Sequence, residues 1–360
     1  MQISFIVVFI LLSGWLIQDD KKVCFQSDEL KNIQLIEREG SFVIKDDTGH
    51  PVEVVSLEDS NGILYWYRRL ETPVCLTGEC KLIEIGIYWY FNGDFLGLEV
   101  YNEPLTKTDH SVFGDQDYQK LLSILENDWS ILREYDREGL LNEDYQEIDG
   151  SSGATKKEIA EESVTGAVYT TYTIWHLIYV GENEQIALLT LDQLNNPERL
   201  KKFVESDNKK VNEFLLDQMA AGYISIVNEL SSFIIESLQS KDLNTQNLAF
   251  RSLKRLELNN NNLQADLAGV YNNAQISAKR RLISALSEVE IIDSSLFNAL
   301  ETDLSIENRK MAIEILKILN NSELTGKKAI DFSYQLLNDE NEEGRKVATN
   351  YLEKHNSLEN

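Results

Sequence analysis

Cysteine and histidine are scarce in this chain, which has three cysteines and four histidines among 360 residues. No C-x-x-C-H segment is present, and so small a set of these residues argues against c-type haem. The sequence also lacks a nucleophile–base triad pattern, a metal-ligand cluster and a pair of carboxylates arranged for hydrolysis. We therefore expect neither the catalytic residues of a hydrolase nor a metal site.

Positive charge is also in short supply. The chain has 34 Lys and Arg against 60 Asp and Glu, so its net charge is −26. Such a chain is repelled by nucleic acid and by an anionic membrane surface. We expect no nucleic-acid partner, whereas basic carriers or cations are compatible partners. The length is sufficient for two or three domains.

The apolar run at residues 3–17 is too short for a confident membrane span and fits the core of a signal peptide. No Lys or Arg precedes the run, no A-x-A cleavage site follows it, and Trp15 stands where a lipidated cysteine would be. We expect an extracytoplasmic protein of the periplasm or cell envelope. Residues 1–20 would be a signal peptide or an uncleaved anchor, and a buried N-terminal strand is the alternative.

Two of the three cysteines, Cys75 and Cys80, are separated by only four residues. In an oxidising compartment they would most simply close a small disulfide loop, leaving Cys24 without a partner. The alternative is a redox pair that cycles between dithiol and disulfide.

The residues from 21 to 101 carry most of the strand signals. Residues 41–44 and 51–55 flank a turn-rich segment and predict a hairpin, and residues 63–67 predict a further strand. We treat residues 21–72 as a β-rich segment. A second hairpin is predicted from residues 82–90 and 94–100, which flank Asn92-Gly93. Helices are expected at residues 116–126 and 130–134.

The most informative stretch is D-x-x-S-G-A-T near the middle of the chain. Its small residues let backbone N–H groups approach a phosphate closely, and its last threonine offers an ester oxygen. The aspartate would orient the segment. The fixed positions are Asp149, Ser152, Gly153, Ala154 and Thr155.

The same threonine allows a second interpretation. Thr155 and Glu158 have the S/T-x-x-E spacing of a capping box, which would open a helix without any cofactor. The two interpretations are compatible.

The D-x-x-S-G-A-T stretch resembles the acceptor motif of covalently flavinylated proteins. These include the FMN-binding subunits of sodium-pumping quinone reductases and Rnf-type electron-transport complexes. The resemblance implies that a flavin transferase joins FMN, through its phosphate, to the hydroxyl of Thr155. The hairpin at residues 82–100 is similar to one early in that family's domain, so we place an FMN-binding-like domain at residues 73–188.

The family's flavin-contacting loop is not reproduced at residues 103–110. Thr106, Lys107 and His110 are nevertheless suitable donors for flavin carbonyls or phosphate, and the alternative is that they cap the helix that follows. After the motif, apolar residues from Val164 to Tyr179 recur at helical spacing, with a strand as the second choice. Trp175 and His176 on this helix would pack against the flavin ring or, alternatively, lie in the core.

From residue 191 to 360, strand signals give way to Leu- and Ala-rich helical patterns. Aligned leucines recur at spacings of 33, 30 and 36 residues, and each is preceded by Ala or Leu four positions earlier. The aligned leucines are Leu253, Leu286, Leu316 and Leu352. Such a period resembles HEAT-like α-solenoid repeats, with an irregular helical bundle as the alternative.

The sequence thus predicts an α+β FMN-binding domain followed by an all-α, HEAT-like domain. We expect an extracytoplasmic electron carrier with FMN on Thr155, matured by a flavin transferase. Its helical domain would dock a redox protein or a membrane electron-transport partner. The alternatives are an interaction scaffold whose helical domain is the functional part, and a flavin/disulfide reductase using Cys75 and Cys80.

Overall fold

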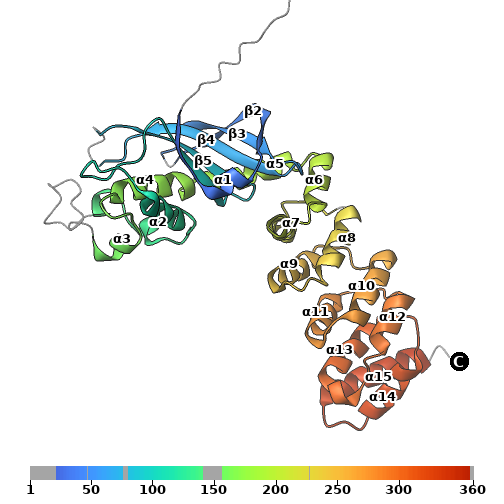
Figure 1. The fold of residues 1–360 in the computed structure, drawn as a ribbon. Helices are drawn as coiled ribbons and strands as arrows, with labels where there is room; N and C mark the ends of the chain where they lie inside the picture. The colour runs from blue at the N-terminus through green and yellow to red at the C-terminus, as the bar shows by residue number, and fades with distance from the viewer. Residues whose placement is uncertain (1–21, 47, 76–79, 141–155, 227, 357–360) are drawn as a thin grey trace, which may run out of the picture. The chain divides into compact units, whose positions relative to one another are not determined.

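A computed structural model of the protein describes residues 22–46, 48–75, 80–140, 156–226 and 228–356. The chain divides into two compact units between Thr190 and Leu191. The first unit holds all the labelled strands and the second only helices (Figure 1). The predicted order, an α+β part followed by an all-α part, is confirmed. Within the described residues, no helix is both long and apolar enough to cross a membrane.

The first unit is built on one antiparallel sheet with the strand order β1-β6-β5-β4-β3-β2. Its strands are β1 (Val23–Gln26), β2 (Ile36–Lys45), β3 (Pro51–Glu58), β4 (Leu64–Thr72), β5 (Ile83–Tyr90) and β6 (Phe95–Tyr101). Strands β2 to β6 pair in chain order, as short connections allow. The border expected at residue 72 falls within one sheet, because β4 pairs with β5 from Tyr65 to Thr72.

Side chains alternate across this sheet, and one face forms the core. On β5, Ile85, Ile87 and Trp89 are fully buried. They pack with residues of α2 (Asp115–Leu125) and α4 (Val168–Tyr179) in a single hydrophobic cluster. Complete burial of each such side chain contributes about 1.5–3 kcal/mol, so this face holds the helices on the sheet.

The segment between α2 and α4 is irregular. The helix predicted at residues 130–134 is a 3-10 turn, η1 (Ile131–Glu134), and a second turn follows, η2 (Glu138–Leu140). A helix was expected to begin at Thr155–Glu158. The helix found there, α3 (Lys157–Glu161), is short, and its N-cap residue, Lys156, makes no side-chain hydrogen bond to the helix. The chain then breaks before α4 at Gly166, whose φ of +75° favours glycine. The helix predicted from the residues between Val164 and Tyr179 is α4.

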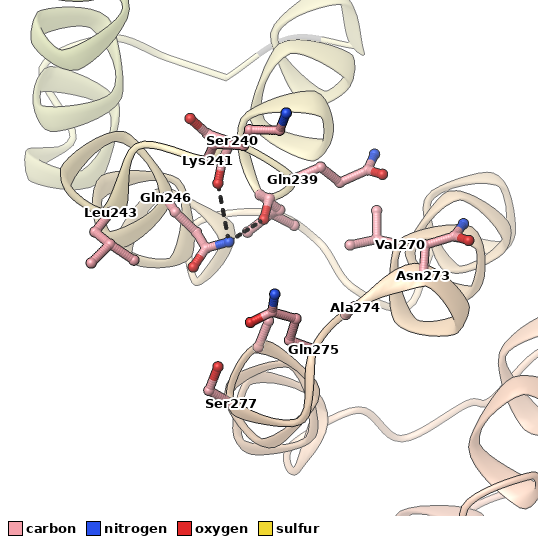
Figure 2. A pocket seen from close by; sticks show the side chains of 12 residues that line it. Gln239, Ser240, Lys241, Leu243, Gln246, Val270, Asn273, Ala274, Gln275 and Ser277 are labelled. Atoms are coloured by element: carbon pink, nitrogen blue, oxygen red, sulfur yellow. Dashed lines mark hydrogen bonds between the residues drawn. The ribbon is translucent and has the colours of Figure 1, made fainter.

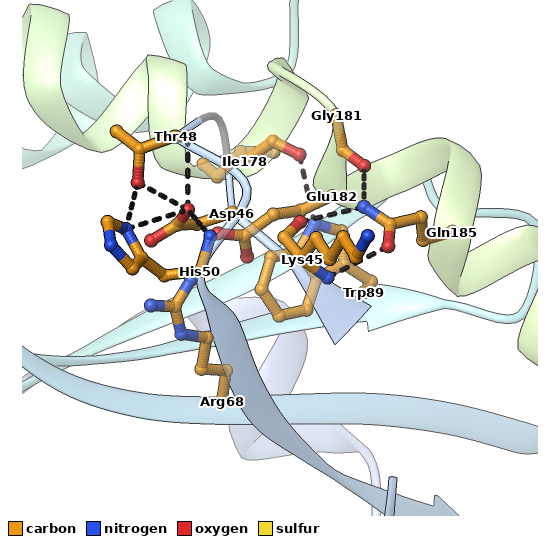
Figure 3. A network of polar contacts seen from close by, with 10 residues as sticks. All are labelled: Lys45, Asp46, Thr48, His50, Arg68, Trp89, Ile178, Gly181, Glu182 and Gln185. Atoms are coloured by element: carbon orange, nitrogen blue, oxygen red, sulfur yellow. Dashed lines mark hydrogen bonds and ion pairs between the residues drawn. The ribbon is translucent and has the colours of Figure 1, made fainter. Parts of the chain in front are cut away.

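Helix α5 (Glu182–Gln193) is fastened to the sheet by polar contacts (Figure 3). The Gln185 amide accepts from the Lys45 backbone N–H at 2.8 Å and donates to the Lys45 carbonyl at 2.7 Å. Glu182 forms a buried ion pair with Arg68 on β4. These contacts keep the start of α5 in the first unit.

The second unit is a series of helix pairs. The helices are α6 (Pro197–Val204), α7 (Lys209–Ala221), α8 (Asn228–Ser237), α9 (Leu243–Leu253), α10 (Asn261–Asn273), α11 (Ile276–Leu286), α12 (Ser294–Glu301), α13 (Arg309–Leu319), α14 (Lys327–Leu336) and α15 (Glu342–Asn356). Each even-numbered helix packs on the next odd-numbered one, and α7, α9, α11, α13 and α15 pack in succession. This nearest-neighbour packing is typical of an α-solenoid.

The repeat seen in the sequence coincides with the core of the second unit. The four aligned leucines, on α9, α11, α13 and α15, are all buried, and so are the residues four positions before them. Ion pairs join neighbouring pairs of helices at three of the junctions: Lys209–Asp242 at 2.7 Å, Lys279–Asp303 at 2.7 Å and Arg309–Asp339 at 3.2 Å. The spacing therefore reflects stacking of equivalent helices.

Candidate functional site

The acceptor motif, Asp149 to Thr155, lies outside the described residues. The chain is described again from Lys156, the residue after the predicted acceptor. The Lys156 backbone N–H donates to the carbonyl of Leu140 at 3.3 Å, and its ammonium lies 5.0 Å from the centre of the Tyr135 ring. The residue that follows the motif is thus held against η2.

Thr106, Lys107 and His110 lie in one tight hairpin loop. Thr106 forms an antiparallel bridge with Val112, and the Lys107 N–H donates to the Ser111 carbonyl at 2.8 Å. His110, with a φ of +64°, makes the turn. The loop brings the three side chains onto one small element.

These residues do not cap α2, as one interpretation of the sequence expected. The N-cap is Gly114, whose N–H donates to the Asp117 carboxylate at 3.0 Å. Lys107 contacts α2 in a different way, because its ammonium lies 2.8 Å from the same carboxylate. The loop is therefore tied to the first turn of α2 through Asp117.

All three loop residues line a cavity of about 390 Å³, which we name the disulfide pocket. Its other walls come from the two cysteines and from the first turn of α4. The residues that line it include Cys75, Cys80, Lys81, Thr106, Lys107, His110, Ala167 and Thr170. The volume lies within the range of small-molecule sites.

Cys75 and Cys80 are joined by a disulfide with their Cα atoms 5.8 Å apart. The backbone N–H of each cysteine lies 3.0 Å from the sulfur of the other. Cys24, on β1, is a free thiol. The structure therefore places a potential redox centre in the wall of the pocket that holds the predicted flavin donors.

The residues that line the pocket include two lysines and no carboxylate, although the chain as a whole is acidic. Lys81 and Lys107 line it, whereas their carboxylate partners, Glu103 and Asp117, do not. The N–H groups at the N-terminus of α4 contribute a partial positive charge, and no acidic residue in the first turn of that helix offsets it. Such a wall can hold an anion or polarise a carbonyl.

Trp175 and His176 do not line this pocket. The Trp175 ring is fully buried, and its N–H donates to the Asn127 carbonyl at 2.9 Å. The His176 Nε2 lies 3.0 Å from the Leu132 carbonyl. Both side chains hold the segment after α2 against α4, which is the core role that the sequence left open for them.

Sequence reasoning missed the wall contributed by α4, including Tyr169 and Thr170. The available signal was Gly166, because a glycine within a helical pattern marks a break and a new helix start.

In the part of the chain that the structure describes, no group of three or more His, Cys, Asp or Glu could hold a metal ion.

A second cavity, also of about 390 Å³, lies in the helical unit (Figure 2). It lies between the turn joining α8 to α9 and the turn joining α10 to α11. Gln246 donates to the carbonyls of Leu238 and Ser240 at 3.0 and 3.4 Å, so its amide N–H groups serve the local fold. The cavity is a groove between neighbouring repeats, the kind of surface on which solenoids bind partners.

Comparison with known proteins adds little to this geometry. No protein-family model matches the chain, and no curated protein matches it. Among solved structures, an engineered protein from a structural genomics consortium is similar, with 18% sequence identity and a TM-score of 0.30. The match covers 47% of this chain and 86% of that one. At this TM-score the likeness carries no argument.

Proposed function

We propose that this protein is an extracytoplasmic electron carrier whose FMN is attached through its phosphate to Thr155. The observation that carries the proposal is the complete D-x-x-S-G-A-T pattern ending at that threonine. FMN would supply the redox chemistry, while the chain supplies attachment, orientation and electrostatics.

The residues of the disulfide pocket support the proposal by their chemistry. A flavin ring presents carbonyl oxygens and ring nitrogens that accept hydrogen bonds. Thr106, Lys107 and His110 carry a hydroxyl, an ammonium and an imidazole, and Val74 and Ile83 add apolar surface to the same cavity. The donor set therefore fits a flavin ring.

Maturation and electron delivery would require two kinds of partner. A flavin transferase would attach the FMN, and a redox protein or membrane electron-transport partner would exchange electrons with it. The grooves between repeats of the helical unit are suited to docking such a partner. The disulfide is consistent with an oxidising compartment, as expected from residues 1–20.

The proposal is tested by co-expression with an exported flavin transferase, followed by a denaturing gel. Wild-type protein should fluoresce in the gel, because the phosphoester survives unfolding. Thr155→Val should abolish the fluorescence, whereas Thr165→Val, which alters an exposed threonine outside the motif, should retain it. Equal fluorescence of the two variants would refute Thr155 as the acceptor.

A second candidate, a flavin/disulfide reductase, is favoured by the position of the disulfide beside the flavin donors. Reduction of Cys75–Cys80 to two thiols takes two electrons and two protons, which reduced FMN would supply. The test is anaerobic photoreduction of the flavinylated protein, followed by alkylation and mass spectrometry. Alkylation of both cysteines only after photoreduction would support a reductase. If both cysteines stay protected from alkylation after photoreduction, the protein acts as a simple electron carrier.

A further inference from the structure

We propose that the helical unit binds an extended acidic peptide segment of a partner protein, which lies across the exposed N-terminal turns of α9, α11, α13 and α15. This surface lies wholly in the helical unit, so its occupancy does not depend on whether the first unit carries FMN.

The first observation is a row of exposed apolar side chains. Leu243 and Ile276 are the first residues of α9 and α11, and Ile306 lies in the turn η4 (Ile306–Asn308) that leads into α13. All three stand ten positions before the aligned leucines, and they are 72%, 47% and 39% exposed. The aligned leucines are buried, so the repeat carries a second apolar position that does not serve the core. Apolar side chains that gather on a surface mark an interaction site.

The second observation is a row of cations one turn further along the same helices. Arg280, Lys310 and Lys346 stand six positions before the aligned leucines, and all three are exposed. In the part of the chain that the structure describes, none of the three forms an ion pair, whereas the adjacent Lys279 and Arg309 are held by carboxylates. Residues four apart lie on one face of a helix, so the cation and the apolar side chain of a repeat share a surface.

The two rows together form a surface that we name the binding strip. It consists of Leu243, Ile276, Ile306, Arg280, Lys310 and Lys346. The apolar row ends at α15, where the exposed Glu342 stands at the equivalent position.

The third observation is the cavity of the helical unit, which lies at the start of the binding strip (Figure 2). Leu243 lines this cavity together with Lys241, which forms no ion pair with any described residue. None of the described residues that line it carries a carboxylate, although the chain has 60 Asp and Glu. The cavity therefore continues the apolar and cationic character of the strip and gives a partner side chain a place to insert.

Spacing and charge together indicate the kind of partner. The helices α11, α13 and α15 pack in succession, and packed helices lie about 8–10 Å apart, so the cations recur at about that distance. A polyproline II chain advances about 3.1 Å per residue with three residues per turn, so carboxylates at every third position stand about 9 Å apart along one side. Such a segment can place a carboxylate at each cation and its apolar side chains on the apolar row. Single-stranded nucleic acid has the same sign of charge, but it offers no aliphatic side chain for that row.

The experiment is fluorescence anisotropy of a labelled peptide of repeated Glu-Pro-Leu triplets, titrated with the full-length protein expressed without a flavin transferase. Two peptides of matched length are controls: one has the same composition with its glutamates in a single block, and the other has Lys in place of Glu. Labelled oligothymidylate tests the nucleic-acid alternative. The protein variants are Lys310→Glu and Leu243→Ala, which alter the strip, and Lys328→Glu, which makes the same charge change at an exposed lysine of α14 outside it.

We expect the peptide with spaced glutamates to bind with a Kd below about 100 µM, and about fivefold more tightly than either control peptide. Lys310→Glu should weaken binding about tenfold, because it replaces an attraction by a repulsion, and Leu243→Ala should weaken it about threefold. Lys328→Glu should bind as the wild type does. Circular dichroism checks that each variant folds, and the comparison of peptides on wild-type protein needs no variant.

Binding weaker than about 100 µM would overturn the proposal, as would equal affinity for the spaced and control peptides. Equal effects of Lys310→Glu and Lys328→Glu, or tighter binding of oligothymidylate than of the peptide, would overturn it as well. Because the protein carries no flavin, these outcomes are independent of the fluorescence test of Thr155.

Discussion

The Lys107 ammonium lies 2.8 Å from the carboxylate of Asp117, and this pair ties the loop of the disulfide pocket to α2. Burial raises the pKa of Asp117, but the Lys107 hydrogen bond, the Gly114 N–H and the Lys107 charge outweigh it, so the pKa lies below 3.8. A carboxyl with a depressed pKa stabilises the fold above its unfolded pKa, and this contribution is lost as the pH falls through the folded value.

We therefore predict that Asp117→Asn lowers the free energy of unfolding by about 0.5–1 kcal/mol at pH 7, as expected for a partly exposed pair. The difference between wild type and variant should shrink when denaturant unfolding is repeated near pH 3. A constant difference across this range would show that the pair does not contribute through charge.

Gly93, in the turn between β5 and β6, should be irreplaceable. Its φ is +86°, and a Cβ atom there would lie 2.2 Å from the carbonyl oxygen of Asn183 on α5. Gly93→Ala should cost about 2–4 kcal/mol in urea unfolding, through backbone strain and a forced shift of α5. Gly49, with a φ of +82° and open space around it, is the matched control, and Gly49→Ala should cost only about 1 kcal/mol. Equal costs would mean that contact with α5 is unimportant.

The parts of the fold that local sequence predicts are those with a clear period. The strand-like runs at residues 82–90 and 94–100, together with the turn at Asn92-Gly93, predicted β5 and β6, and the leucine spacing predicted the stacked helices. The joining of both N-terminal segments in one sheet was not predictable, because pairing of β4 with β5 is a tertiary contact. The helix of α4 was predicted, but its start after a break at Gly166 was not, because apolar residues recur at helical spacing across the break.

The site was predictable only in part. Thr106, Lys107 and His110 were identified by chemistry, and the structure brings them to one cavity. Their neighbours Cys75, Cys80 and Thr170 are distant in sequence, so only the fold places them together. Trp175 and His176 were ambiguous because a buried aromatic residue looks the same in sequence whether it faces a ligand or the core.

The helical unit should fold by itself. A fragment of residues 191–360 should give a strongly helical circular-dichroism spectrum and a cooperative melt, since its helices pack mainly on their neighbours. Truncating Leu286 or Leu316 to Ala should cost about 2–5 kcal/mol, because both are fully buried. Leu243→Ala, at a site 72% exposed, should change stability by less than about 0.5 kcal/mol. A fragment that folds only with residues 21–190 would mean a single fused domain.

The last helix should be sensitive to mild acid. His355 is buried, and neither of its ring nitrogens has a hydrogen-bond partner among the described residues. Burial, and secondarily the charge of Lys354, hold its pKa below 6.5, while Glu323 opposes them. The unfolded chain therefore binds the proton more readily, and stability present above about pH 6.5 should be lost as the pH falls.

Thermal melts of the 191–360 fragment between about pH 7.5 and pH 5.5 would check this prediction. The melting temperature should fall with pH in the wild-type fragment and fall less in His355→Leu, which keeps an apolar side chain in the same space. Identical pH dependence of the two fragments would show that His355 does not control it.

The central claim is most directly tested by peptide mass spectrometry of protein exported in the presence of a flavin transferase. Trypsin should release residues 138–156 as one peptide, since Arg137 and Lys156 bound it. The account predicts that this peptide gains the mass of one FMN minus water and that fragmentation places the addition on Thr155. An unmodified peptide in fully exported protein, or FMN found on another residue, would contradict it.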